Sequence, residues 1–487
     1  MKKVLSVFLA LVAVVTLVAC DNTVKPSTGV GYGLVHKHYV GKATLTVDGE
    51  GLVTEAKLDE YYLPYNIANV TGQVGTYKGV AYGLVHKHYV GMVTITTDKD
   101  VVTDAEIDEY YLPYNLANLA NQTVADGATD AVSVVGASST TVYAKYFSAG
   151  GTLWTSKGAN AWFATIDGKE VNIEDWVKTP ANAKVYAEAC DNDKIFIANS
   201  DGTKHASYKT QYEIAANNAN TDNTAKTGVA RYLKSTTGYG GTRWDWQDAM
   251  DKLVDLFKGS KMDANLEDAA INDDGFWNVG GVVTDSTLVD FKDYYTVGVN
   301  AYKGRVVISG PTDTFIDGTK LYAKYVKVGD VLFTGSTGSS ATDGTPVYSA
   351  SGITDIEQWV KTPANAKAYA EACDSGNVFL ATSAGAKHAS YKTYYEFANN
   401  LTGVSQFLKS TTGYGGTKWD WKDAMDKLEK LFKGSKMNLN MADADTNDDG
   451  FWVIGDLTTD STLVDFKDYY AVGLTAYNDA IANRNAK

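Results

Sequence analysis

Two pairs of histidines stand two residues apart, His36 with His38 and His86 with His88. On a strand, such neighbours face the same side about 7 Å apart, so two hairpins could gather four imidazoles around a metal. No cysteine or carboxylate completes the set at ligand spacing. Histidines on a solvated or half-buried strand are therefore the favoured interpretation, and their role stays open.

A second candidate is a calcium loop that begins at Asp445 and continues through Asn447, Asp449 and Gly450, with Asp456 at the twelfth place. The pattern matches the start of an EF-hand loop, although aspartate replaces the usual glutamate at its end. The corresponding segment of the earlier copy lacks both the first and the last ligand. A simple Asn-Asp-Asp-Gly turn explains what the copies share, so calcium is the less favoured alternative.

A third candidate is a glycine- and aromatic-rich segment that occurs twice, at 235–246 and at 410–421. Its glycines allow close backbone approach, and its aromatic rings offer flat faces to a flavin or a sugar. The ring-bearing candidates are Tyr239, Trp244, Tyr414 and Trp419. A loop that is buttressed by its own aromatic residues is the equally weighted alternative.

A fourth candidate is a pair of threonines, Thr287 and Thr462, in the repeated sequence Thr-Asp-Ser-Thr-Leu-Val-Asp-Phe. We expect each threonine to stand where a final helix begins. Free N–H groups and partial positive charge at a helix start favour a phosphate. The plainer alternative is that both threonines only cap their helices.

Internal repeats show how these candidates are positioned. A short unit occurs at 32–66 and again at 82–115, and its alternating pattern predicts strand, turn and strand, as in a β-hairpin or a meander. A long unit also occurs twice, and after a β-segment it has helical periodicity, for example in Trp246, Met250, Leu253 and Phe257. The expected fold is α+β, with duplicated N-terminal β-hairpin units followed by two duplicated α+β modules. The expected parts are a signal peptide at 1–20, a tether at 21–29, short β units at 30–75 and 76–139 (with a linker), and long repeats at 140–303 and 304–487.

The N-terminus has the pattern of an export signal: two lysines, an apolar run, and Leu-Val-Ala-Cys ending at Cys20. This ending resembles a bacterial lipobox, so we expect lipid on Cys20 and a protein held on the outer face of the cell membrane. The other cysteines, Cys190 and Cys373, occupy equivalent places in the two long repeats. Each is expected to be a small buried helix residue.

Composition narrows the function further. The formal net charge is −14, from 44 basic and 58 acidic residues, which disfavours binding to nucleic acid. The 32 tyrosines and 10 tryptophans suit surfaces that meet a planar or sugar-like ligand. Hydrolase motifs such as Gly-x-Ser-x-Gly and His-Glu-x-x-His do not occur in the sequence.

The order of motifs in the long unit resembles the FMN-binding domain of secreted flavoproteins, in particular the PplA-type lipoproteins of extracellular electron transfer. The motifs are Tyr232-Leu-Lys234, Trp246-Gln247, Asn272-Asp-Asp-Gly275 and Thr284-Asp-Ser-Thr287. In that family a threonine of an Asp-x-x-Ser-Gly-Ala-Thr element takes FMN through a phosphoester, whereas this chain has only Asp-Ser-Thr. The segments ending at Ser138 and at Thr312 look nearly as similar.

The resemblance implies an FMN-carrying electron-transfer lipoprotein with one flavin per long repeat, more an electron carrier than a true enzyme. Thr287 and Thr462 would accept the phosphoester. A membrane quinone oxidoreductase and a flavin transferase would be its partners. The alternative is a non-catalytic extracellular lipoprotein that binds carbohydrate or another ligand through its repeats.

Overall fold

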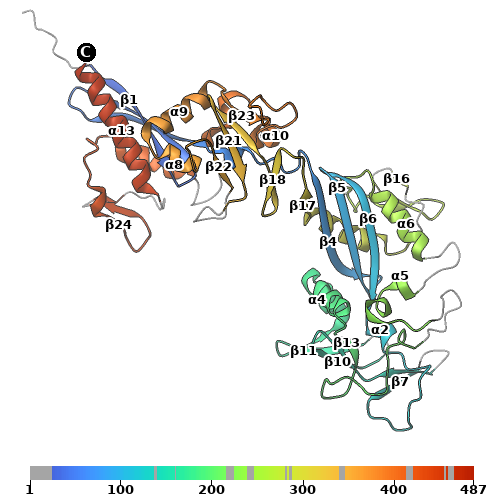
Figure 1. The fold of residues 1–487 in the computed structure, drawn as a ribbon. Coiled ribbons are helices and arrows are strands. Elements are labelled where there is room, and N and C mark those ends of the chain that lie inside the picture. Colours follow the sequence, from blue (N-terminus) through green and yellow to red (C-terminus); the bar gives the residue numbers. More distant parts are fainter. Residues whose placement is uncertain are drawn as a thin grey trace, which may run out of the picture. The chain divides into compact units, whose positions relative to one another are not determined.

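The computed structural model describes residues 25–135, 140–158, 161–214, 224–237, 246–279, 282–283, 288–338, 346–412, 421–454, 457–458 and 465–486. The fold is mixed α+β with antiparallel sheets, as the sequence predicts. The chain divides into two compact units (Figure 1). Unit 2 is the continuous segment Val70–Leu321, and unit 1 combines residues up to Asn69 with those from Tyr322 onward.

Each unit therefore combines one short β unit with one long repeat. The second short unit packs with the first long repeat in unit 2, while the first short unit packs with the second long repeat in unit 1. An isolated β-hairpin or meander is only marginally stable, so each short unit needs the helices of a long repeat to cover it. The repeats in the sequence leave open which short unit associates with which long repeat.

Unit 2 is inserted between Asn69 and Tyr322 of unit 1, two residues whose backbones are paired. Asn69 and Tyr322 form an antiparallel bridge, and the amide of Ala323 donates to the carbonyl of Ala68. The equivalent bridge in unit 2 joins Asn118 to Tyr143. In unit 2, the segment between these two residues contains the paired strands β7 (Ala131–Val135) and β8 (Thr140–Ala144). In unit 1, the whole of unit 2 is inserted at the equivalent position.

The short units fold as three-stranded meanders rather than simple hairpins. Their strands are β1 (Ser27–Val35), β2 (Tyr39–Val47) and β3 (Val53–Tyr62) in unit 1, and β4 (Thr76–Val85), β5 (Tyr89–Asp98) and β6 (Val101–Tyr111) in unit 2. Strand β17 (Val306–Ser309) extends the second meander beside β4. Short helices follow the meanders, α1 (Pro64–Ile67) and α2 (Pro113–Leu116).

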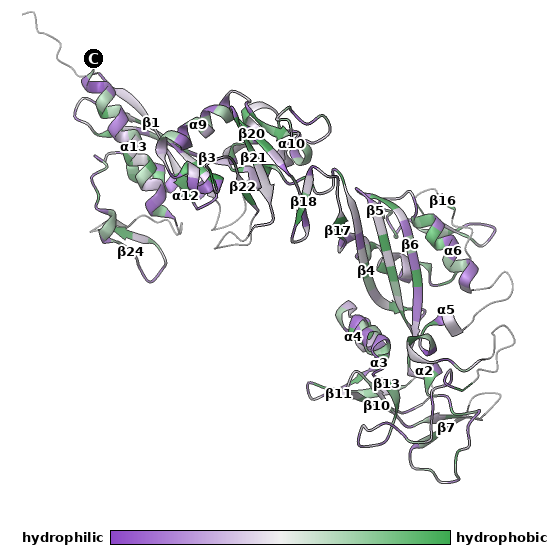
Figure 2. Ribbon diagram, viewed as in Figure 1, coloured by the Kyte–Doolittle hydropathy of each residue, from purple (hydrophilic) through white to green (hydrophobic). Residues whose placement is uncertain are grey.

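Helices of the long repeats cover the meanders (Figure 2). In unit 2, α6 (Trp246–Phe257) contacts β6, and α7 (Phe291–Lys303) contacts β4 and β5. In unit 1, α12 (Trp421–Phe432) contacts β3, and α13 (Phe466–Asn485) contacts β1 and β2. The predicted stripe of Trp246, Met250, Leu253 and Phe257 is buried in this core, which confirms the helical periodicity.

A glycine lets the final helix lie directly on the meander. A Cβ on Gly79 would stand 2.0 Å from the carbonyl oxygen of Ala301 in α7, and one on Gly29 would stand 2.2 Å from the carbonyl oxygen of Ala476 in α13. Both distances are shorter than a van der Waals contact, so only glycine permits this approach.

Each long repeat adds a second sheet and two further helices. In unit 2 the sheet order is β12-β11-β10-β9-β13, and in unit 1 it is β22-β21-β20-β23. The strands are β9 (Tyr146–Ala149), β10 (Thr152–Ser156), β11 (Trp162–Ile166), β12 (Lys169–Asn172), β13 (Ile195–Ala198), β20 (Tyr325–Val328), β21 (Val331–Ser336), β22 (Val347–Ser349) and β23 (Val378–Ala381). The helices are α3 (Ile173–Val177) and α4 (Pro180–Asp191), with α8 (Ile356–Val360) and α9 (Pro363–Asp374).

Helix α4 begins with Thr179 at the N-cap and Pro180 at the first helical position, where a proline is well tolerated. Cys190 and Cys373 are buried free cysteines at the ends of α4 and α9, in agreement with the sequence. Burial raises the pKa of both thiols, so neither favours the reactive thiolate.

The remaining elements are short. They are β7 (Ala131–Val135), β8 (Thr140–Ala144), β14 (Ala270–Ile271), β15 (Trp277–Val279), β16 (Val282–Val283), β18 (Thr314–Asp317), β19 (Lys320–Ala323), β24 (Ala444–Thr446), β25 (Trp452–Ile454), β26 (Leu457–Thr458), α5 (Lys234–Thr237), α10 (Tyr394–Asn399), α11 (Lys409–Thr412), and the 3-10 turns η1 (Gly228–Arg231), η2 (Gly403–Gln406) and η3 (Met441–Asp443). Within the described residues, no helix is both long and apolar enough to cross a membrane.

Candidate functional site

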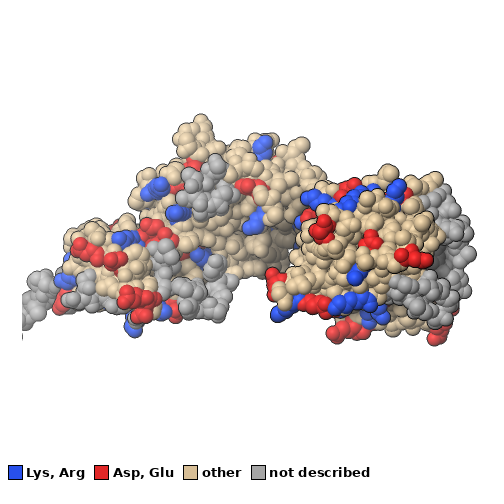
Figure 3. Space-filling view, turned by 90° about the horizontal axis from the view of Figure 1, so that it is seen from below, with Lys and Arg blue, Asp and Glu red and all other residues tan. Residues whose placement is uncertain are grey.

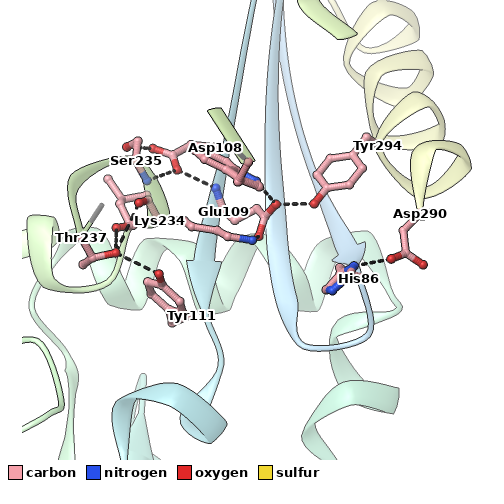
Figure 4. A network of polar contacts seen from close by, with 11 residues as sticks. His86, Asp108, Glu109, Tyr111, Lys234, Ser235, Thr237, Asp290 and Tyr294 are labelled. Carbon is pink, nitrogen blue, oxygen red and sulfur yellow. Dashed lines mark hydrogen bonds and ion pairs between the residues drawn. The ribbon is translucent and has the colours of Figure 1, made fainter. Parts of the chain in front are cut away.

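A buried carboxylate organises the end of the second meander (Figure 4). Glu109 lies on β6, where the last five residues are all buried because protein covers both faces of the strand. The Lys234 ammonium donates to Glu109 Oε2 at 2.8 Å. The other oxygen, Oε1, accepts hydrogen bonds from the Trp246 indole and the Tyr294 hydroxyl. Glu109 is fully buried, so these partners supply the compensation that a buried charge needs.

Aromatic rings complete the surroundings of the lysine. The Lys234 nitrogen lies 4.2 Å from the ring centroid of Tyr89 and 5.3 Å from that of Trp246. Burial lowers the pKa of Lys234, and the charge of Glu109 opposes that shift. Burial, together with the neighbouring Glu109 charge, raises the pKa of Tyr294.

The preceding residue, Asp108, bonds to the short helix α5, which also contains Lys234. Its carboxylate accepts hydrogen bonds from the Ser235 amide at 3.1 Å, from the Ser235 hydroxyl, and from the Glu109 amide at 2.7 Å. Burial raises the pKa of Asp108 despite these hydrogen bonds. The Thr237 hydroxyl lies 2.9 Å from the Tyr111 hydroxyl, and the Tyr111 ring stacks on Tyr212 at 4.7 Å between centroids.

This network anchors a segment on both sides. Residues 235–237 and Trp246 are the two ends of the glycine- and aromatic-rich segment 235–246, and both ends bond to the last residues of β6. We name the groups of Asp108, Glu109, Tyr111, Lys234, Ser235, Thr237, Trp246 and Tyr294 the anchor network.

Unit 1 repeats the anchor network. Lys409 donates to Glu60 at 2.8 Å, and Trp421 and Tyr469 bond to the other oxygen of Glu60. The Ser410 amide donates to Asp59 at 3.2 Å, and the hydroxyls of Tyr62 and Thr412 lie 2.8 Å apart. Two copies of the same arrangement show that it is a constant part of the module.

The sequence predicts the paired histidines on strands, but they lie in turns between strands. His36 and Lys37 have φ of 49° and 56°, and His86 and Lys87 have 47° and 58°, so each His-Lys pair turns the chain between two strands. The paired imidazoles therefore do not share a strand face. That prediction was wrong because a left-handed turn replaces the strand alternation at these residues.

Each histidine has its own carboxylate partner instead. His86 contacts Asp290 and His88 contacts Glu174, the latter at 2.7 Å. The counterparts in unit 1 are His36 with Asp465 and His38 with Glu357, the latter at 2.5 Å. Among the described residues, no group of three or more His, Cys, Asp or Glu side chains could hold a metal ion.

The final helices begin later than predicted. Helix α7 starts at Phe291 and α13 at Phe466, with Asp290 and Asp465 at the N-cap positions. Neither aspartate makes a side-chain cap bond, because each carboxylate lies against a turn histidine. The prediction that these helices open at Thr287 and Thr462 was wrong by this shift of several residues.

The candidate calcium segment forms a hairpin turn between β24 and β25. The Asn447 side-chain oxygen accepts from the amides of Asp449 and Phe451, at 3.1 and 2.9 Å. Asn272 makes the same two bonds in unit 2, so this turn is what the two copies share. Asp456 lies outside the described residues.

The predicted flavin and lipid positions also lie outside the described residues: Cys20, Thr287, Thr462, Tyr239, Trp244, Tyr414 and Trp419. Sequence reasoning missed Glu109 and Lys234 with their counterparts Glu60 and Lys409. The available signal was a charged residue amid buried strand residues, present in both Asp-Glu-Tyr-Tyr copies, together with the duplicated Lys-Ser-Thr-Thr.

Acidic and basic side chains are interspersed on the face drawn in Figure 3.

Comparison with known proteins gives no match to a family model, a curated protein or a solved structure.

Proposed function

We propose that the protein is an exported lipoprotein, anchored through lipid on Cys20, that carries one FMN in each unit and transfers electrons at the outer face of the membrane. The observation that carries the proposal is the doubly anchored segment. In each unit a stretch rich in glycine and aromatic residues is fixed at both of its flanks by the same buried hydrogen bonds. Rigid support of this kind at both ends suits a segment that positions a ligand.

The described groups define what remains for the flavin. The Lys234 ammonium and the Ser235 hydroxyl beside the segment already serve Glu109 and Asp108. Both groups therefore support the segment, and we do not expect them to bind the phosphate of FMN. The residues proposed to contact the flavin ring are Tyr239, Trp244, Tyr414 and Trp419. The residues proposed to bind the phosphate are Thr287 and Thr462. Once bound, the isoalloxazine would supply the redox chemistry, and the protein would supply position and electrostatics.

Flavin content tests this proposal directly. The mature chain is co-expressed with a flavin transferase, precipitated in acid and run on a denaturing gel, where attached FMN fluoresces under ultraviolet light. We expect about two flavins per chain, one in Thr287→Val or Thr462→Val and none in the double variant. Thr296→Val, on the body of α7, is the control and keeps both flavins.

Each failure has a distinct meaning. Flavin retained in the double variant would move the attachment to Ser138 or Thr312. A wild-type chain without flavin would overturn the FMN proposal. It would favour the alternative, a non-catalytic extracellular lipoprotein that binds carbohydrate or another ligand.

A further inference from the structure

Each unit has a surface pocket in the same place, separate from the anchor network. In unit 2 it has a volume of about 440 Å³ and lies between the end of β4, the start of α4 and the first turns of α7. In unit 1 a pocket of about 350 Å³ lies between β1, α9 and α13. The linings differ only where Thr296 and Asn300 of unit 2 replace Ala471 and Thr475 of unit 1.

Two lysines line each pocket, Lys87 and Lys178 in unit 2 and Lys37 and Lys361 in unit 1. Lys178 also contacts Asp175 at 2.6 Å, but both side chains are largely exposed, so that pair holds the ammonium only weakly. In unit 1 the Lys361 ammonium donates to Gln358 Oε1 at 2.8 Å, again in an exposed contact. A ligand that enters the pocket can compete with such exposed contacts for the ammonium groups.

The position of Lys87 is costly for the backbone. Lys87 and the adjacent His86 both have positive φ, at 58° and 47°, in a turn where glycine or asparagine would be less strained. The same strained pair recurs as His36 and Lys37. Strain of this kind persists when the residue has a use, and here it places a lysine at the pocket.

Other surface lysines of the meander are not the same in the two units. A second groove of unit 1 is lined by Lys42 and Lys57. The strand registers place Met92 and Glu106 at the equivalent positions of unit 2. The meanders have thus diverged at two surface lysines but have kept the pocket lysine of the turn, Lys37 in unit 1 and Lys87 in unit 2.

We propose that each pocket binds an anionic sugar, a monosaccharide that bears a phosphate or a carboxylate. The two lysines suit the anionic group. Tyr82 and Pro180 present apolar surfaces to the sugar ring, and Asp293 is placed to accept hydrogen bonds from its hydroxyls. The pocket volumes suit one small ligand, and the site does not depend on flavin.

Binding to the flavin-free mature chain tests the proposal. Equilibrium dialysis at low salt would use glucose 6-phosphate and glucuronate as probes, with glucose and inorganic phosphate for comparison. We expect at least one of the two anionic sugars to saturate at two per chain, and glucose and phosphate to bind at least tenfold more weakly. The better probe shows whether phosphate or carboxylate is preferred.

Variants assign the sites. Lys87→Met with Lys178→Gln should leave one site per chain, and adding Lys37→Met with Lys361→Gln should leave none. The matched control is Lys42→Met with Lys57→Glu, which copies the residues of unit 2 and should keep both sites. Tyr82→Leu with Tyr32→Leu provides a second, uncharged test and should weaken binding at least fivefold. Thermal melting confirms that each variant is folded.

Three results would overturn the proposal. They are the absence of saturable binding by both anionic sugars, unchanged binding in the four-lysine variant, and an equal loss in the control, which would indicate only a general charge effect. A flavin-free chain that binds the sugars supports this proposal even if the FMN proposal fails.

Discussion

The imidazole of His86 lies against the carboxylate of Asp290, which stands at the N-cap of α7. The two residues are 204 positions apart, yet their contact joins the β4–β5 turn to the start of the helix that covers the meander. His36 and Asp465 make the same contact in unit 1 across 429 positions. All four histidines that suggested a metal site thus pair with acidic groups at the starts of helices.

Replacing His86 should loosen this connection. We expect His86→Ala to lower the free energy of unfolding by about 1 kcal/mol, because a partly exposed pair is lost while the strained turn is kept. Chemical denaturation measures the change. Lys99→Ala is the control, since Lys99 also has positive φ in a turn between two strands of the same meander. An equal loss in both variants would contradict a specific role for the imidazole.

The Glu109 carboxylate should matter far more. Glu109→Gln leaves the Lys234 ammonium buried beside a neutral group, so we expect a loss of about 3–5 kcal/mol. Calorimetry of the mature chain measures it. Glu106→Gln, at an exposed position of the same strand, should change stability by less than about 0.5 kcal/mol. Similar effects of the two variants would show that the anchor network is not a major source of stability.

Asp108 should give stability a dependence on pH. Burial raises its pKa in the folded protein, so protonation favours folding, and this contribution is lost as pH rises through the folded pKa. Asp108→Asn keeps an oxygen acceptor and removes the titration. We therefore expect the variant to gain stability relative to the wild type as the pH rises above about 4, the ordinary pKa of an aspartate. Parallel stability curves for the two proteins would contradict this prediction.

Two glycines should differ in how they tolerate a methyl group. Gly79→Ala places its Cβ 2.0 Å from a backbone oxygen of α7, whereas Gly83→Ala meets only a methyl group of Val297, at 2.8 Å. We expect Gly79→Ala to cost more than about 3 kcal/mol and Gly83→Ala about 1–2 kcal/mol. Thermal melting orders the variants. The reverse order would mean that α7 moves more easily than the packing indicates.

The insertion of unit 2 suggests a test by excision. Because Asn69 and Tyr322 form a bridge, a short glycine-rich linker between them should let unit 1 fold without residues 70–321. The excised segment has its own core, so it should also fold alone. Cooperative thermal unfolding of both products is the expected result. A disordered segment 70–321 would show that unit 2 depends on the rest of the chain.

The sequence by itself determined the α+β class, the two kinds of repeat and the buried faces of the main helices. These features depend on periodicity within about twenty residues, as in the stripe from Trp246 to Phe257. It also indicated the turn at Asn447, whose side chain bonds to nearby backbone amides. Local patterns of this kind are decided by neighbouring residues.

Only the tertiary structure decided which short unit joins which long repeat, and that Glu109 pairs with Lys234 across 125 positions. It also decided that His86 lies in a turn and faces Asp290, although alternation favoured a strand. The physical reason is that near-identical repeats offer near-identical local patterns. The choice between partners then depends on chain connectivity and on burial of polar groups, which form only when distant segments meet.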